Sequence, residues 1–237
     1  MNEHAKYYTI YPLCVKTLIL PPSPASEAAL YNTCVIWDNE DVIRREVNLR
    51  LFDGAQVLRI RKGNVMKGLV HLYCGDGKGK TSSAAGLALR CAGAGGKVVF
   101  VSFLKDGTSS EIPMLEKCEG ISVLMCRRQF GFVKDMDETT RSEAAQAYQK
   151  LLEEALREAK DADMIVLDEI CAACRFGMVS EQKLLDYLDS PERNAEVVMT
   201  GRDPLPSMKD RADYLTVMTK EKHPFDRGIS ARRGIEY

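Results

Sequence analysis

The sequence has no long apolar run and no surplus of charge of either sign. No stretch approaches the roughly 20 consecutive apolar residues that a membrane-spanning helix needs. The 33 basic side chains nearly balance the 34 acidic ones, for a net charge of −1. This balance argues against a nucleic-acid-binding protein, which usually carries a basic surplus. With 45% hydrophobic and 28% charged residues, the 237-residue chain has the composition of a soluble globular protein.

Histidine is also scarce. The only histidines are His4, His71 and His223, and no Ser-His-Asp set or nucleophile elbow is present. His71 lies in a predicted core strand, where a hydrogen-bonded structural role is the simpler interpretation. The chain thus lacks an obvious histidine base or protein nucleophile. This favours a reaction whose nucleophile arrives with the second substrate.

The eight cysteines lack the spacing of a zinc site or of a disulfide framework. Only Cys171 and Cys174 form a C-x-x-C, and neither a second such pair nor a histidine pair completes a tetrahedral set. We therefore expect free thiols in a reducing cytoplasm.

The composition changes near residue 66. Residues 1–65 contain the only tryptophan and a Pro-Pro-Ser-Pro run, and a lysine interrupts the apolar segment 7–20, which argues against a signal peptide. Residues 61–63 can be encoded by an unbroken purine run where a bacterial ribosome-binding site would lie, so Met66 is a candidate start. The alternative, left equally open, is a genuine N-terminal extension that packs on the domain 66–237.

From residue 66 onward, short apolar segments alternate with helical patterns. The predicted strands are 68–73, 97–104, 121–125, 164–167, 197–200 and 214–218. The predicted helices are 80–94, a short helix capped by Ser109 or Ser110 and ending at Lys117, 140–160 and 181–188. This alternation predicts an α/β fold, a P-loop NTPase-like open, mostly parallel sheet with helices on both faces.

A glycine-rich loop lies between the first strand and the first helix of this region. Its glycines allow backbone N–H groups to surround phosphate oxygens, Lys80 adds a full charge, and Thr81 offers a hydroxyl to magnesium. The candidate ATP-binding residues of the loop are Gly75, Asp76, Gly77, Lys78, Gly79, Lys80, Thr81 and Ser82. The usual pattern G-x-x-x-x-G-K-[ST] has glycine where this chain has Cys74, which suggests an unusual placement of the nucleotide. The alternative is a glycine-rich turn with an incidental lysine.

Two carboxylates follow the predicted strand 164–167. Ligands of open α/β sheets bind at the carboxyl ends of the strands, so Asp168 is predicted to hold magnesium directly or through water, and Glu169 to share that role. The alternative is a strand that ends in ordinary surface acids.

Three basic residues follow predicted strands or lie on the first helix, near the same edge of the predicted sheet. Arg202 follows a Thr-Gly turn after a buried strand, Lys105 ends another strand, and Arg90 lies ten residues along the first helix. Arg90 and Arg202 are candidate ATP ligands, although a solvated charge is the simpler interpretation of each one alone.

Four segments together, GDGKGKTSSAAG, VLDEI, VMTGR and the tail KHPFDRGISARRGIEY, resemble the P-loop ATP:corrinoid adenosyltransferases. The resemblance spans 66–237, and the tail is its most specific part. It implies transfer of the 5′-deoxyadenosyl group of ATP to the Co(I) centre of a reduced corrinoid, cobalamin or a precursor, with release of triphosphate. Lys80, Thr81 and Asp168 would then be catalytic, with Mg²⁺ accompanying an ATP that lies reversed in the loop. The family also implies a homodimer and a flavoprotein reductant.

The resemblance further implies aromatic residues below the corrin ring, in the loop after the third strand. Phe132 matches an aromatic position of the family, whereas Lys134 stands where some relatives have tryptophan. Phe130 is the candidate substitute, and Phe130 and Phe132 are therefore the predicted corrinoid-binding residues. The alternative is that both phenylalanines pack into the core.

Two other functions are compatible with the loop alone. A P-loop kinase or ATPase would need a residue that activates water or a hydroxyl, and would release phosphate or ADP. A nucleotide-dependent corrinoid-binding protein would show no turnover. The specific tail argues against both.

Overall fold

The structure, a computed structural model, describes residues 67–105 and 109–237, together with the backbone of five short strands nearer the N-terminus. The chain divides into two compact units, Met1–Val65 and Met66–Tyr237. In the first unit, β1 (Thr9–Ile10) pairs with β2 (Val15–Lys16), and β3 (Leu18–Ile19), β4 (Cys34–Asp38) and β5 (Asp41–Arg45) form an antiparallel sheet. The sequence does not predict these pairings. The candidate start at Met66 lies outside the described residues and stays a prediction.

The second unit contains a six-stranded sheet in the order β11-β6-β10-β9-β7-β8. Its strands are β6 (Val70–Cys74), β7 (Val98–Ser102), β8 (Ile121–Met125), β9 (Met164–Asp168), β10 (Glu196–Thr200) and β11 (Tyr214–Val217). Every pairing in this sheet is parallel. All residues of the central strands β7 and β9 are buried, as expected for strands covered on both faces.

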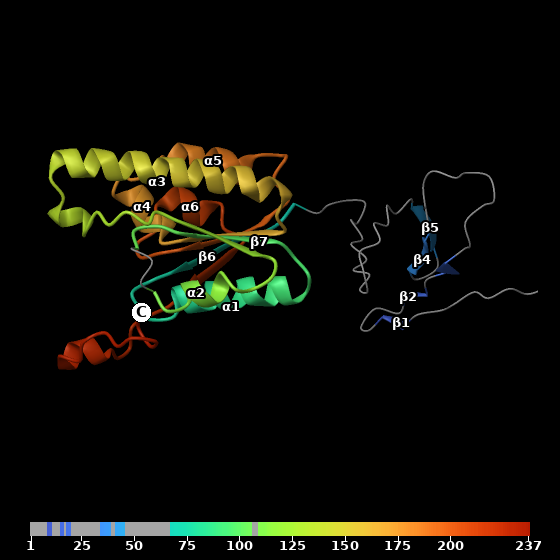
Figure 1. Cartoon of the computed structure of the whole chain (residues 1–237), viewed down its shortest axis with the longest axis horizontal. Coiled ribbons are helices and arrows are strands. Elements are labelled where there is room, and N and C mark those ends of the chain that lie inside the picture. The colour runs from blue at the N-terminus through green and yellow to red at the C-terminus, as the bar shows by residue number, and fades with distance from the viewer. Residues whose placement is uncertain are drawn as a thin grey trace, which may run out of the picture. The chain divides into compact units, whose positions relative to one another are not determined.

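Helices cover both faces of this sheet, α1 and α2 on one face and α3 to α6 on the other (Figure 1). The helices are α1 (Lys80–Gly93), α2 (Ile112–Leu115), α3 (Glu138–Glu158), α4 (Ile170–Arg175), α5 (Glu181–Asp189) and α6 (Pro206–Asp210). The chain runs from β6 outward to β7 and β8, and then returns through β9 and β10 to β11. Because parallel crossovers are right-handed, this reversal of direction places the later helices on the opposite face. The predicted fold class is confirmed.

The core has two parts, one under each helical layer. The larger part includes the buried side chains of α3, namely Ala144, Tyr148, Leu151, Leu152 and Ala155. The smaller part packs alanines of α1 against β7 and β9. The helix α3 begins after Asp137, whose carboxylate accepts a hydrogen bond of 2.7 Å from the Thr140 backbone N–H. No helix of the described residues is long and apolar enough to span a membrane.

The long periodic elements agree with their predicted positions within a few residues. The prediction of the short helix near residue 112 was wrong at both ends, because it spans Ile112–Leu115 and its N-cap is Glu111 rather than a serine. The sequence also fails to predict α4 and α6. Helices of six and five residues are too short to display a 3.6-residue apolar period.

Candidate active site

The glycine-rich loop connects β6 to α1 and is braced by the chain that follows β11. Gly75 has a φ of +101°, and a Cβ there would lie 2.4 Å from the carbonyl oxygen of Met218. The Gly77 N–H donates a hydrogen bond of 2.7 Å to the same carbonyl. Only glycine allows both the left-handed backbone and this close approach at position 75.

Lys80 turns inward from the start of α1 and is 8% exposed. Its ammonium donates hydrogen bonds of 2.7 Å to the carbonyl oxygens of Gly75 and Gly77. Burial, and after it the positive charge of Arg202, lower the pKa of Lys80. The loop therefore concentrates positive charge that a bound anion would stabilise.

Asp168 ends β9 and is fully buried. Its Oδ1 accepts hydrogen bonds from the hydroxyls of Thr81 at 2.8 Å and Thr200 at 2.7 Å. Its Oδ2 lies 2.7 Å from the ammonium of Lys105, which also lies 3.2 Å from Thr81 Oγ1. Burial is the largest single influence and lowers the pKa of Lys105, but the carboxylates of Asp168, Glu111 and Glu169 together raise it, so the net shift is upward. Thr81, Lys105 and Asp168 thus form one cluster.

Glu169 follows in the left-handed region, with a φ of +61°. Burial, and after it the neighbouring Asp168 carboxylate, raise the pKa of Glu169. Two other non-glycine residues with positive φ, Leu104 and Asp203, follow the carboxyl ends of β7 and β10. Such conformations are costly and collect at functional sites, and all three lie along the same edge of the sheet.

A cavity of about 860 Å³ opens beside the loop. Its lining residues come from α1, the segments after β7 and β8, α3 and the C-terminus: Thr81, Ser82, Ala85, Gly86, Leu89, Leu104, Lys105, Ser109, Ser110, Glu111, Arg128, Gln129, Phe130, Gly131, Phe132, Tyr148, Gly234, Ile235, Glu236 and Tyr237. The lining combines charged and polar side chains with apolar ones such as Leu89, Leu104 and Phe132. The cavity can hold a ligand far larger than a phosphate group.

The two predicted corrinoid residues both line this cavity, but their environments differ. Phe130 is partly buried and packs on the larger core, with its ring centroid 6.0 Å from that of Tyr148. Phe132 is 77% exposed, and the Lys134 ammonium lies 5.8 Å from its ring centroid. The alternative of two core phenylalanines therefore does not describe Phe132.

The remaining predicted ATP residues are not all brought together. Arg90 is exposed in the last turn of α1, about 15 Å along the helix axis from Lys80, and does not line the cavity. Asp76 accepts a hydrogen bond of 3.0 Å from the Lys220 backbone N–H, and Lys78 binds the C-terminal residues. Arg202 is exposed but close enough to affect the pKa values of Lys80 and Glu169.

Comparison with known proteins decides the family. The sequence model of ATP:corrinoid adenosyltransferase BtuR/CobO/CobP matches residues 66–237. The chain belongs to this family. It is 32% identical over 182 residues to a corrinoid adenosyltransferase of Pseudomonas aeruginosa, covering 76% of this chain and 88% of that protein. It is 29% identical over 181 residues to one of Escherichia coli strain K12, covering 76% and 90%.

These matches confirm the predicted family and the predicted transferase class.

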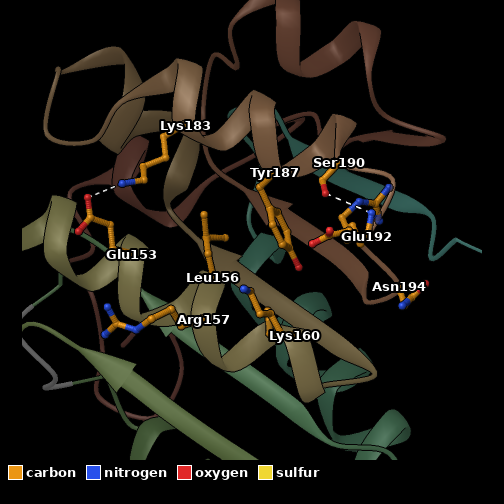
Figure 2. Close-up of a pocket in the computed structure, with 11 residues that line it drawn as sticks. Glu153, Leu156, Arg157, Lys160, Lys183, Tyr187, Ser190, Glu192 and Asn194 are labelled. Carbon is orange, nitrogen blue, oxygen red and sulfur yellow. Dashed lines mark hydrogen bonds and ion pairs between the residues drawn. The ribbon is translucent and has the colours of Figure 1, made fainter.

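The adenosyltransferase domain also contains a second cavity, of about 380 Å³, between α3, α5 and the segment before β10 (Figure 2). Glu153 and Lys183 form an ion pair of 2.5 Å at its rim. Because the end of α3 precedes β9 and the segment 190–194 precedes β10, this cavity lies at the amino edge of the sheet. It contains none of the predicted site residues.

Sequence reasoning missed two groups at the adenosyltransferase site. Thr200 bonds both the Asp168 carboxylate and the Glu169 N–H, and its position at the end of a predicted strand was the available signal. The C-terminal residues Gly234–Tyr237 line the cavity, although the tail was used only as a mark of the family. His71 has the structural role expected of it, because its Nε2 lies 2.6 Å from Glu196 Oε1.

Proposed function

We propose that this adenosyltransferase joins C5′ of ATP to the cobalt of a reduced corrinoid and releases triphosphate. The observation that carries the proposal is that a positively charged phosphate loop adjoins a large cavity whose lining is partly apolar. Co(I) supplies both electrons of the new cobalt–carbon bond, and the C5′–O5′ pair leaves with the triphosphate. No protein nucleophile is needed, in accord with the absence of a histidine at this site among the described residues.

The loop serves the leaving group. Lys80 is held by two carbonyl oxygens, and because these partners are neutral they leave the positive charge of its ammonium at the loop. A preorganised cation of this kind stabilises charge that develops on the departing triphosphate, without reorganisation at the moment of reaction. Arg202 adds a second positive charge nearby. The residues of the loop also hold C5′ toward the cavity, which supplies the orientation that the reaction needs.

Magnesium fits the donor set around Asp168. Thr81 and Asp168 supply oxygen ligands of the kind that Mg²⁺ prefers, and Glu169 adds a second, partly buried carboxylate. The Lys105 ammonium already contacts both Thr81 Oγ1 and Asp168 Oδ2, which shows that a positive charge is accommodated between them. When bound, the ion would neutralise charge on the triphosphate. Thr200 would keep the Asp168 carboxylate oriented through its hydrogen bond.

The apolar part of the cavity suits the corrin ring. Leu89 on α1 and Phe132 in the loop after β8 are exposed hydrophobic side chains that both line it. Burying them against a ligand would stabilise the complex, at about 25 cal/mol for each Å² of apolar surface removed from water. Phe132 is therefore proposed to contact the corrinoid, with Phe130 behind it against the core. A homodimer and a flavoprotein that reduces the cobalt are further proposals that follow from the family.

The experiment is an anaerobic assay with ATP, magnesium and chemically reduced cobalamin, in which absorbance reports the change from Co(I) to an alkylcobalamin. A light-sensitive product with stoichiometric triphosphate is expected. Lys80→Ala should lower the rate at least about 100-fold, as the loss of a transition-state cation does. Lys150→Ala, an exposed lysine on α3, is the matched control. Release of phosphate or ADP without alkylation would show an ATPase or kinase instead, and ATP binding without turnover would show a binding protein.

A further inference from the structure

The C-terminal residues form a compact turn of their own. The backbone N–H and guanidinium of Arg232 bind the Glu236 carboxylate at 2.9 to 3.1 Å. The N–H groups of Ile235 and Glu236 donate to the Arg232 carbonyl, and the Gly234 N–H donates to Tyr237. These contacts hold the Glu236 carboxylate in its ionised form, and the Arg232 hydrogen bonds lower the pKa of Glu236 to about 2. We call residues 232–237 the terminal turn.

Two side chains from elsewhere hold the terminal turn against the cavity. The Lys78 ammonium, in the middle of the glycine-rich loop, lies 2.6 Å from the Ile235 carbonyl oxygen and 3.2 Å from Glu236 Oε1. The Ser110 hydroxyl donates a hydrogen bond of 2.9 Å to a terminal oxygen of Tyr237. These contacts join positions more than 120 residues apart in the sequence. The terminal turn is thus docked on the site rather than trailing from the fold.

The chemistry of the terminal turn suits the corrinoid rather than the triphosphate. Ile235 and Tyr237 are about half exposed, at 55% and 46%, and both line the cavity. Beside them lies the Glu236 carboxylate, which is paired with Lys78 and Arg232, so these two cations have less charge to offer a triphosphate. Apolar side chains next to a carboxylate therefore form a wall for a large apolar ring with polar amide substituents.

We propose that Lys78 is a positioning residue, which fixes the terminal turn as a wall of the corrinoid-binding part of the cavity. This inference rests on the proposed function and deepens it. Lys78 is separated from Lys80 by one residue, yet the two ammonium groups face different partners: carbonyl oxygens of the loop for Lys80, and the terminal turn for Lys78. One glycine-rich loop thereby organises both substrates, with Lys80 assigned to ATP and Lys78 to the corrinoid through the tail.

The first test measures docking without any substrate. Carboxypeptidase releases Tyr237 from the full-length protein, and mass spectrometry gives the rate. Lys78→Gln should accelerate release about tenfold or more, as expected when hydrogen bonds from a charged group are lost, and Lys78→Arg should restore much of the protection. Lys150→Gln removes an exposed charge outside the terminal turn and is the matched control. An unchanged rate in Lys78→Gln would overturn the inference, whatever the protein catalyses.

The second test separates the two substrates. Lys78→Gln should raise KM for the corrinoid about tenfold and leave KM for ATP within about twofold. A chain ending at Gly234, which lacks both partners of the Lys78 ammonium, should show the same pattern. Combining the two changes should add little, because each removes the same contact. A raised KM for ATP with an unchanged KM for the corrinoid would make Lys78 a phosphate ligand. Full additivity would show that Lys78 does not act through the terminal turn. Either result would refute its positioning role. A wild-type protein without alkylation would refute the proposed function alone, since Tyr237 release still decides the docking.

Discussion

Asp168 is the residue on which the site depends most. A fully buried carboxylate is costly unless it is paired, and here two hydroxyls and one ammonium bind its two oxygens. These partners come from α1, from the segment after β7 and from β10, so Asp168 also fixes three segments relative to one another. Its position is therefore both structural and, in the proposed reaction, catalytic.

Asp168→Asn should lower kcat/KM for ATP about 100-fold or more, because an amide supplies neither the charge for magnesium nor a full acceptor for Lys105. The magnesium concentration that gives half-maximal rate should rise. Steady-state assays across a magnesium titration measure both effects, and circular dichroism monitors folding. Asp161→Asn, at an exposed position, is the control. A wild-type magnesium response in Asp168→Asn would contradict the assignment.

At the scale of single residues, the sequence predicted which residues lie at the site better than it predicted their hydrogen-bond partners. Lys80, Thr81 and Asp168 could be found because the loop and the strand end have recognisable patterns. The only signal for Thr200 was its place at the end of a predicted strand, and Ser110 had no signal for its contact, because its partner lies 127 residues away. Lys78 was taken for a phosphate ligand on its place in the loop. Its ammonium instead contacts the C-terminal residues, and sequence alone does not predict that this distant segment lies beside the loop.

At the scale of elements, the site depends on strand ends that meet at one edge of the sheet. The polar site residues lie at the carboxyl ends of the strands, where each buried strand meets a loop. The helices packed on the sheet hold these strand ends in place. The helix α3 contributes most to the larger core, through an apolar stripe repeated at three- and four-residue intervals. Such periodic elements are predictable from sequence because packing demands the pattern. Short helices such as α4 show no such pattern, because contacts with the surrounding structure determine where they form.

Leu152→Ala should lower the free energy of unfolding by about 2–5 kcal/mol, because Leu152 is fully buried and its truncation leaves a cavity. Urea denaturation followed by circular dichroism measures the change. Glu154→Ala, on the exposed side of the same helix, should shift stability by no more than about 0.5 kcal/mol. Equal effects of the two substitutions would contradict the packing described for α3.

At the scale of the whole molecule, the sheet, both cores and the candidate site are contained in Met66–Tyr237. The family match covers the same residues. The change in composition near residue 66 made this division visible in the sequence, because an alternating pattern of strands and helices starts there. The sequence offered no comparable pattern for the first 65 residues.

A chain shortened to residues 66–237 should fold cooperatively and keep its adenosyltransferase rate within about twofold, as an independent domain does. Thermal unfolding and the anaerobic assay test this against the full-length chain. Loss of folding would show that residues 1–65 stabilise the domain. Separately, an intact mass of the native protein beginning at Asn2 would refute Met66 as the start.

The brace between the glycine-rich loop and Met218 has a consequence for biosynthesis. The loop lies in the first third of the chain, whereas β11, which pairs with β6 at Tyr214↔His71, and the Met218 carbonyl that holds Gly77 lie near its end. A nascent chain on the ribosome can form α1 early, but it cannot close this edge of the sheet until almost the last codons are translated. Products of premature termination before β11 would therefore expose β6 as an unprotected edge, and proteolytic quality control would encounter them as incomplete molecules.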